Sequence, residues 1–270
     1  MEHGALSFEL AAASVLGREH ARAGRNNQDA YCTRASARGL AAVVADGCGS
    51  GKQSELGAQL GARRAVEGAL ALLEEGVAPG APDFLARLEA GLLGFLGGLA
   101  RELGGAAVGE ALLFTLVGAV CTPDEVLVFA AGDGLWALNG EVHTLGPFPG
   151  NAPPYLAYGL LHPGRALLHR QALRPAGEVD SLVLGTDGAA DLRGLAEARL
   201  PELDEPVGPL SRLWTEDRYF THPDALRRRL VQLSRESVRA DFAAQRLVRT
   251  PGLLADDTTL VILRRPRGRS

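Results

Sequence analysis

The stretch Ala41-Ala42-Val43-Val44-Ala45-Asp46-Gly47 joins an apolar run to an aspartate and a glycine. Short apolar runs between turn signals are typical of strands, so Leu40 to Ala45 is predicted to be a strand that ends at Asp46. The same junction recurs where VFAAG meets Asp133-Gly134 and where LVLGT meets Asp187-Gly188. In reverse order, Asp256-Asp257 leads into TTLVIL. One Asp-Gly pair is most often a plain turn, but four such junctions predict carboxylates held at strand ends.

Further apolar runs of similar length predict the other strands. They are Phe8 to Leu16, Ala111 to Cys121, Glu125 to Ala131, Ser181 to Gly185 and Thr258 to Leu263. Between the runs Trp136 to Leu138 and Glu141 to Leu145, the pair Asn139-Gly140 is the signal of a tight hairpin. A hairpin of this kind implies antiparallel pairing.

Helical periodicity predicts helices over Ser54 to Leu73, Pro82 to Leu103 and Asp224 to Asp241. In the third, apolar side chains form one stripe, which consists of Leu226, Leu230, Leu233 and Val238. Because strands cluster on both sides of the first two helices, without regular strand–helix alternation, the predicted fold class is α+β with antiparallel sheets. Two long loops, Gly146 to Gly164 and Pro201 to Pro209, are equally consistent with functional lids and with surface excursions.

The bulk composition excludes some classes of protein. The 270-residue chain has a formal net charge of −4, so it lacks the positive field that non-specific nucleic-acid binding requires. Its most apolar stretches are too short to span a bilayer, and its amino terminus lacks a signal-peptide pattern. Cys32, Cys48 and Cys121 show neither a disulfide framework nor zinc-site spacing. A soluble protein in a reducing cytoplasm, away from membranes and nucleic acid, fits these features best.

Carboxylates at converging strand ends build a strongly negative pocket. Ionised carboxylates within a few Å raise one another's pKa values unless cations supply the opposing charge. Mg²⁺ or Mn²⁺ suits such an all-oxygen site, since the chain shows no Cys or His cluster that would indicate zinc. A glycine after the aspartate lets the backbone approach closely, so that its carbonyl can also be a ligand.

Five segments, in order along the chain, resemble the motifs of protein phosphatase 2C-type (PPM) enzymes. They are Asn27-Gln28-Asp29-Ala30, Asp46-Gly47-Cys48-Gly49-Ser50, Gly132-Asp133-Gly134, Thr186-Asp187-Gly188 with Asp191, and Asp256-Asp257-Thr258-Thr259. The chain looks closest to the bacterial branch with a Gln-Asp-Ala first motif. This resemblance covers nearly the whole chain. It implies a single domain over residues 1–270, built as two antiparallel sheets stacked face to face with helices outside, an αββα sandwich.

The resemblance implies a metal-dependent protein serine/threonine phosphatase. Such an enzyme hydrolyses phosphoprotein monoesters by in-line attack of a hydroxide that bridges two metal ions. Asp46 would bridge the two ions, the Gly47 carbonyl would bind one, and Asp187 and Asp256 would bind the other. A third, weaker ion would use two further aspartates, Asp133 and Asp191. The expected partner is a phosphorylated protein, with a serine/threonine kinase acting alongside, and the expected state is a monomer.

The first motif departs from the family pattern. Asp29 would orient metal-bound water without binding the metal itself, but Gln28 stands where many members have Glu, so metal binding there is expected to be weaker or differently hydrated. The position for a phosphate-binding arginine, five residues before Asp29, is Gly24. Arg22 and Arg25 flank that position as alternatives, and Arg25 is favoured slightly.

Other positions near the motifs also differ. Cys48 stands where some members have a His that protonates the leaving oxygen, so the proton is expected to come from water. Asp257 replaces a common Asn and adds charge. His20 could lie near the site, although a lone loop His is more often a surface or hydrogen-bonded residue.

Three alternative functions compete with the phosphatase. A protein that keeps this fold but has lost turnover, and acts as a regulatory or phosphoprotein-binding module, is the main one, because Gln28 and Gly24 both lie in or beside the first motif. The run Gly47 to Gln53 superficially resembles a nucleotide-binding loop, but Asp46 and Gln53 replace two of its required residues. A calcium-binding structural module would require a DxDxDG loop, which the chain lacks.

Overall fold

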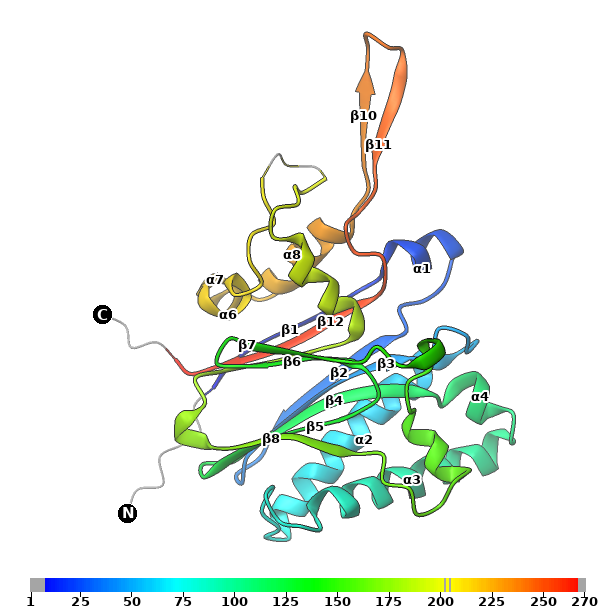
Figure 1. Ribbon diagram of the computed structural model, residues 1–270, viewed down its shortest axis with the longest axis vertical. Coiled ribbons are helices and arrows are strands. Elements are labelled where there is room, and N and C mark those ends of the chain that lie inside the picture. Colours follow the sequence, from blue (N-terminus) through cyan, green and yellow to red (C-terminus); the bar gives the residue numbers. More distant parts are fainter. Residues whose placement is uncertain (1–7, 202, 204, 267–270) are drawn as a thin grey trace.

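The computed structural model describes residues 8–266 apart from 202 and 204, so both ends of the expected 1–270 domain lie outside it. The chain forms two five-stranded antiparallel sheets. Figure 1 shows that they are stacked face to face. The first sheet contains, in spatial order, β1 (Glu9–Val15), β12 (Thr258–Arg264), β9 (Ser181–Gly185), β6 (Gly134–Leu138) and β7 (Glu141–Leu145). The second contains β2 (Asp29–Ala35), β3 (Leu40–Gly47), β4 (Phe114–Cys121), β5 (Glu125–Ala131) and β8 (His169–Pro175).

Helices cover the outer surface of each sheet (Figure 1). Those on the second sheet are α2 (Ser54–Glu74), α3 (Phe84–Leu103) and the short α4 (Ala107–Ala111). Those on the first sheet are α6 (Arg212–Thr215), α7 (Arg218–Thr221) and α8 (Ala225–Ser234). The predicted fold class, an α+β sandwich of two antiparallel sheets flanked by helices, is therefore confirmed. No helix in the described part of the chain is long and apolar enough to cross a membrane.

The core consists of three apolar layers, one between the sheets and one under each set of helices. Successive side chains of a strand point to opposite faces. Val43 of β3 therefore packs toward α2 and α3, while Val44 packs against Leu184 and Val261 of the facing sheet. Because both faces are buried, the strand is apolar at every position, as the sequence of residues 41–45 indicates.

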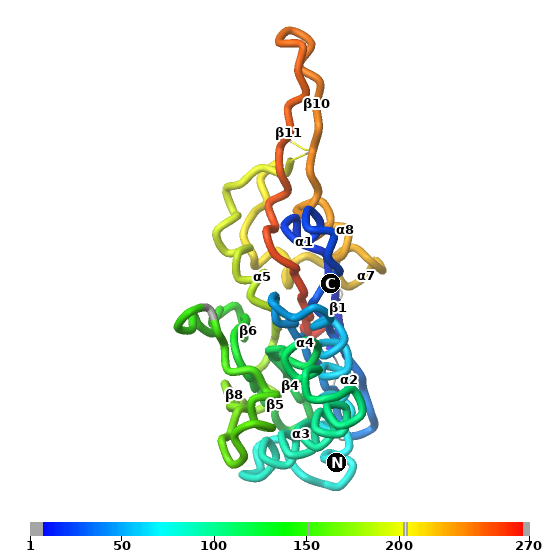
Figure 2. Tube along the Cα trace, turned by 90° about the vertical axis from the view of Figure 1, so that its right-hand side faces the viewer, coloured from blue at the N-terminus to red at the C-terminus, as the bar shows by residue number. Residues whose placement is uncertain are grey.

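The predicted helix over Asp224 to Asp241 is wrong in its second half. Helix α8 ends at Ser234, and the chain continues as β10 (Ser237–Asp241), which pairs with β11 (Arg246–Thr250) in a separate two-stranded ribbon. Leu226, Leu230 and Leu233 are buried against the first sheet, but Val238 is 48% exposed. The helical stripe stops where that sheet no longer covers it. Figures 1 and 2 show the ribbon projecting away from the sandwich.

Smaller differences concern where elements begin. The strand expected from Ala111 starts at Phe114, because α4 ends at Ala111. Helix α3 begins at Phe84, two residues after the expected Pro82. The Asn139-Gly140 hairpin between β6 and β7 is confirmed. Strands β2 and β8 were not predicted, since neither carries a long apolar run.

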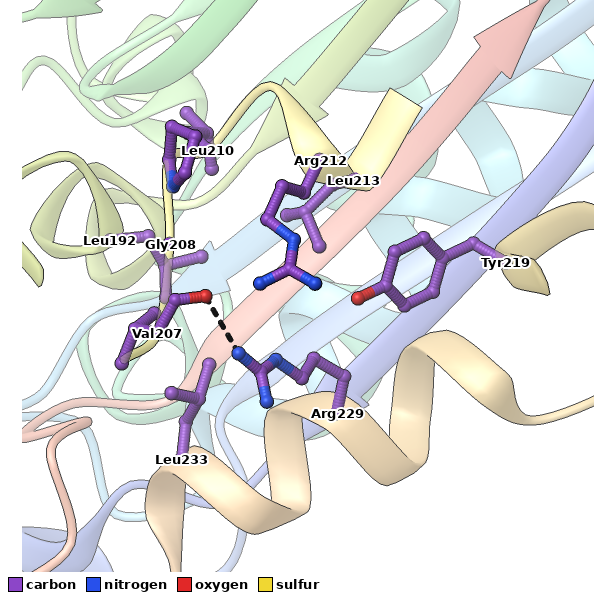
Figure 3. A pocket seen from close by; sticks show the side chains of 10 residues that line it. Leu192, Val207, Gly208, Leu210, Arg212, Leu213, Tyr219, Arg229 and Leu233 are labelled. Carbon is purple, nitrogen blue, oxygen red and sulfur yellow. Dashed lines mark hydrogen bonds between the residues drawn. The ribbon is translucent and has the colours of Figure 1, made fainter. Parts of the chain in front are cut away.

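Both long loops pack against the body. The loop after β7 forms two 3₁₀ turns, η1 (Pro149–Asn151) and η2 (Leu156–Leu160), and buries Tyr155. The loop that includes Val207 is fixed by α8, since Arg229 donates a 2.7 Å hydrogen bond to the Val207 carbonyl. Figure 3 shows this contact beside Arg212 and Tyr219, whose polar ends face the same narrow space. Burial lowers the pKa of Arg229.

Candidate metal centre

The predicted site residues stand where strands of both sheets end. In the second sheet, Asp29 at the start of β2 is the direct cross-strand partner of Asp46 at the end of β3. Asp133 lies between β5 and β6. In the first sheet, Asp187 opens α5 (Asp187–Ala190) just after β9, and Asp256 lies just before β12. The stacking of the two sheets brings these ends together. Asp46 is close enough to four other carboxylates to be repelled by them, namely Asp29, Asp187, Asp256 and Asp133.

The cluster is strained electrostatically. Burial raises the pKa of Asp29 to about 8, with repulsion from Asp257 and Asp187 adding to the shift and a hydrogen bond from Thr186 opposing it. Burial and the neighbouring carboxylates also raise the pKa of Asp46 well above its ordinary value, and they raise that of Asp187 to about 6. Such shifts mean that the charged forms lack compensating positive charge.

Two observations fit a cation at this place. The buried oxygens Asp29 Oδ1 and Asp133 Oδ1 have no hydrogen-bond partner among the described residues. A buried carboxylate oxygen without a donor is costly unless a cation, a proton or a water molecule bound to the cation contacts it. The donor set also consists of carboxylate and carbonyl oxygens, which hard cations such as Mg²⁺ and Mn²⁺ prefer.

The proposed metal ligands do not form one compact group. In the described residues, only His20, Asp256 and Asp257 offer ligand atoms that all lie within 4.8 Å of one another. Asp46, Asp187 and Asp256 do not form so compact a group in the described part of the chain. Asp191, in η4 (Asp191–Leu195), is exposed and adds to the repulsion on Asp187.

The surroundings of Gly47 leave no room for a side chain. A Cβ atom there would lie 2.7 Å from the Ser54 carbonyl oxygen and 2.9 Å from the Gln28 carbonyl oxygen. Its backbone N–H donates to that Gln28 carbonyl at 3.1 Å. The glycine after Asp46 thus lets the first and second motifs pack directly on the start of α2.

Asp257 connects the first motif to the last, a role that the sequence did not predict. Its carboxylate is buried and accepts hydrogen bonds from the backbone N–H groups of Gly17 at 2.7 Å and Gln28 at 2.6 Å. His20 Nδ1 lies 2.8 Å from the same carboxylate. The only signal for this role in the sequence was that Asp257 is the second of two adjacent aspartates before a strand. His20 is a hydrogen-bonded residue, since its ring nitrogen contacts Asp257.

The side chains at and before the first motif differ in burial: Gln28 is buried, Arg25 is half-buried and Arg22 is exposed. Gln28 Nε2 donates to Ser54 Oγ at 2.7 Å, while its buried Oε1 has no partner among the described residues. Arg25 donates to the carbonyl oxygens of Gly49 at 2.6 Å and Gly51 at 2.8 Å. Arg22 is exposed and pairs with Glu19. Of the two candidate arginines, Arg25 therefore contacts the second motif.

Cys48 links the second motif to the loop after β7. Its Sγ lies 3.1 Å from Ser50 Oγ. Burial opposes ionisation of this thiol, but hydrogen bonds from Ser50 and Tyr155 outweigh it and lower the pKa of Cys48. Burial raises the pKa of the Tyr155 hydroxyl, which stays a donor. One of the two long loops thus contacts the candidate site.

Comparison with known proteins agrees with this fold. A family model described as protein phosphatase 2C matches residues 16–233. The fold is similar to that of the S. agalactiae serine/threonine phosphatase, at 14% identity and a TM-score of 0.58, with 96% of this chain and 100% of that chain covered. It is also similar to the serine/threonine phosphatase Stp1 from Staphylococcus aureus, at 14% identity and a TM-score of 0.53, with 96% of each chain covered.

A further solved structure contains metal. The catalytic domain of the serine/threonine protein phosphatase PstP, in complex with two manganese ions, is 18% identical with a TM-score of 0.51, and the match covers 96% of this chain and 98% of that chain. No curated protein matches the chain significantly. The family model spans most of the sequence and includes the first four motifs, so the chain belongs to the protein phosphatase 2C family.

Proposed function

We propose that this protein is a metal-dependent phosphatase that hydrolyses phosphoserine and phosphothreonine in proteins, and that it forms a single domain. The observation that carries the proposal is the meeting of aspartates at strand ends: Asp29 stands directly opposite Asp46 in the ladder, and Asp187 lies close enough to repel both. A protein that brings carboxylates together at buried and half-buried positions without compensating positive charge loses stability. Membership of the protein phosphatase 2C family supports a cation-binding purpose for this arrangement.

The proposed ligands follow the strand ends. Asp46, the Gly47 carbonyl, Asp187 and Asp256 would hold two Mg²⁺ or Mn²⁺ ions, and a third ion would use two further residues, Asp133 and Asp191. When bound, such ions lower the pKa of water and neutralise charge on phosphoryl oxygens.

The protein's own residues position the reactants. Thr186 Oγ1 donates to Asp29 Oδ2 at 2.7 Å, which leaves Asp29 Oδ1 to accept a hydrogen bond from the attacking water. Arg25 is fixed beside the second motif by two carbonyls, whereas Arg22 is paired with Glu19 on the surface. This supports Arg25 as the residue that binds the phosphoryl group. Cys48 lies beside Ser50 and Tyr155, and water supplies the proton for the leaving oxygen.

The expected partner is a phosphorylated protein, for which a serine/threonine kinase is the source. The structural neighbours named serine/threonine phosphatases support this substrate class. A monomer in a reducing compartment is consistent with the three free cysteines.

A regulatory or phosphoprotein-binding protein without turnover is the second candidate. It is favoured by one observation, the neutral Gln28 in the first motif, which donates to Ser54 and leaves its buried carbonyl oxygen without a partner. Because the Gln28 side chain is uncharged, it does not attract a cation through a net charge.

Hydrolysis of p-nitrophenyl phosphate with Mn²⁺ separates the two candidates. Asp187→Asn should lower the rate at least about 100-fold by removing a ligand charge, while Asp180→Asn, at an exposed carboxylate outside the cluster, should match wild type. A wild-type rate no higher than that of Asp187→Asn, with both proteins folded, would favour the binding protein.

A further inference from the structure

The projecting ribbon, residues 237–250, is named the arm. It forms a two-stranded sheet of its own, with no third strand on either edge in the described chain. An isolated hairpin of this kind is only marginally stable in water. The arm nevertheless exposes large apolar side chains, among them Phe242 at 88%, Leu247 at 64% and Val238 at 48%. It also lies beyond residues 16–233, the part that the family model matches.

The register places Val238 and Leu247 on one face, whereas Val248 lies on the other face opposite Arg239. Residues directly opposite each other in a ladder share a face. Val238 stands opposite Arg249, and Ala240 stands opposite Leu247, so these four residues form one face of the arm near its tip residue Phe242. The arm thus presents an apolar strip beside Arg249, which is paired with Glu236. The outer backbone edge of each strand pairs with no other strand in the described chain.

The charge of the arm is opposite to that of the whole molecule. Residues 235–250, which are the arm and the two residues before it, contain four arginines and two carboxylates, although the chain as a whole has a net charge of −4. Asp241 faces Arg246 across the ladder, and Glu236 pairs with Arg249 at 2.9 Å, so two positive charges remain in excess. A partner segment that complements the arm is therefore acidic, with apolar side chains between its charges.

The base of the arm adjoins the candidate metal centre. The chain that leaves β11 contacts α1 (Arg18–Ala23), since the N–H groups of Arg18 and Glu19 donate to the carbonyls of Leu254 and Ala255 at 3.1 Å each. The next residue is Asp256, a proposed metal ligand. Figure 1 shows α1 beside the base of the arm. A protein held on the arm is thereby held next to the site.

We propose that the arm docks an extended, acidic segment of the phosphoprotein substrate. The segment pairs with an open edge of the ribbon and places its apolar side chains on the strip around Leu247, as peptides do when they add a strand to a sheet. This inference rests on the proposed function for the identity of the partner. The arm therefore determines which phosphoproteins are hydrolysed efficiently and leaves small phosphate esters unaffected.

The test compares two substrates. In the double variant Phe242→Ser with Leu247→Ser, the KM for phosphorylated casein, an acidic phosphoprotein, should rise about tenfold, while kcat/KM for p-nitrophenyl phosphate stays within about twofold of wild type. Leu103→Ser, which alters an apolar side chain 56% exposed at the end of α3, is the matched control and should change neither value. Equal losses on both substrates, or no loss on casein, would overturn the proposal.

Binding is measured separately from hydrolysis, so that failure of the docking proposal can be distinguished from failure of the proposed phosphatase function. Fluorescence anisotropy of labelled phosphorylated casein should show about tenfold weaker binding to the double variant than to Leu103→Ser, even if wild type hydrolyses nothing. Equal binding by the two variants would refute the arm as a docking site. Arm-dependent sedimentation with phosphatidylserine vesicles, without arm-dependent casein binding, would assign the surface to a membrane and overturn the protein partner.

Discussion

Among single residues, Asp257 has the most distinctive surroundings. Its buried carboxylate joins the turn at Gly17, the first motif at Gln28 and the side chain of His20. These partners lie more than 200 positions away in the sequence, since the separations are 240, 229 and 237 residues. Asp257 therefore holds together both ends of the chain that supply Asp29 and Asp256.

Replacing Asp257 should destabilise the fold. Asp257→Ala leaves two buried N–H donors without an acceptor and is expected to cost about 2–4 kcal/mol in the free energy of unfolding. Asp257→Asn keeps one carbonyl acceptor and should cost less. Urea denaturation measures both, with exposed Asp180→Ala as the control, expected within about 0.5 kcal/mol of wild type. An Asp257→Ala variant as stable as that control would contradict the role given to this carboxylate.

The raised pKa values predict how stability depends on pH when metal is chelated. The pKa values of Asp29 and Asp187 are about 8 and about 6 in the folded protein, against about 3.9 in an unfolded chain. Between these values the folded state holds protons that the unfolded state has released, so stability decreases as pH rises. From pH 5.5 to pH 8, Asp29 alone lowers the free energy of unfolding by about 3 kcal/mol.

Thermal melting in EDTA and in Mn²⁺ checks this dependence. The chelated protein should melt at a lower temperature at pH 8 than at pH 5.5, and Mn²⁺ should raise the melting temperature more at pH 8, where fewer protons compete for the carboxylates. A chelated protein that becomes more stable over this range would show that the carboxylates are compensated in some other way.

Among elements, those with one strong periodicity were predictable and those defined by distant partners were not. The strand Leu40–Gly47 is apolar throughout because layers cover both its faces, so sequence alone indicated it. Strand β2 has exposed positions at its far end and forms because β3 pairs with it. The predicted helix ran on into β10 because Val238 continues the helical spacing. The first sheet no longer covers the chain after Ser234, and that depends on tertiary structure, which the local sequence does not show.

The arm should contribute little to stability. Replacing residues 239–248 with a short glycine-containing turn removes mainly exposed side chains, so the free energy of unfolding should change by less than about 1 kcal/mol. Leu230→Ala, which removes a fully buried side chain of α8, should cost about 2–5 kcal/mol as the comparison. Urea denaturation of the two proteins measures both changes in the free energy of unfolding. A similar loss in both would mean that the arm is part of the folded core.

In the molecule as a whole, stacking of the two sheets creates the candidate site. Asp46 comes from the second sheet, while Asp187 and Asp256 come from the ends of strands in the first. The strand-end pattern predicted that such carboxylates converge, and their mutual repulsion agrees with it. The contacts of Gln28, Arg25 and Asp257 could not be predicted, because they depend on how loops from distant parts of the sequence pack.

The most direct test of the central claim is the release of inorganic phosphate from a phosphothreonine peptide. With Mn²⁺ the wild type should release phosphate, EDTA should abolish the release, and Asp46→Asn should reduce it at least about 100-fold. Asp180→Asn should behave as wild type. Wild-type release that persists in EDTA or survives Asp46→Asn, or a folded, Mn²⁺-binding wild type that releases no phosphate, would contradict a metal-dependent phosphatase built on the aspartates at the strand ends.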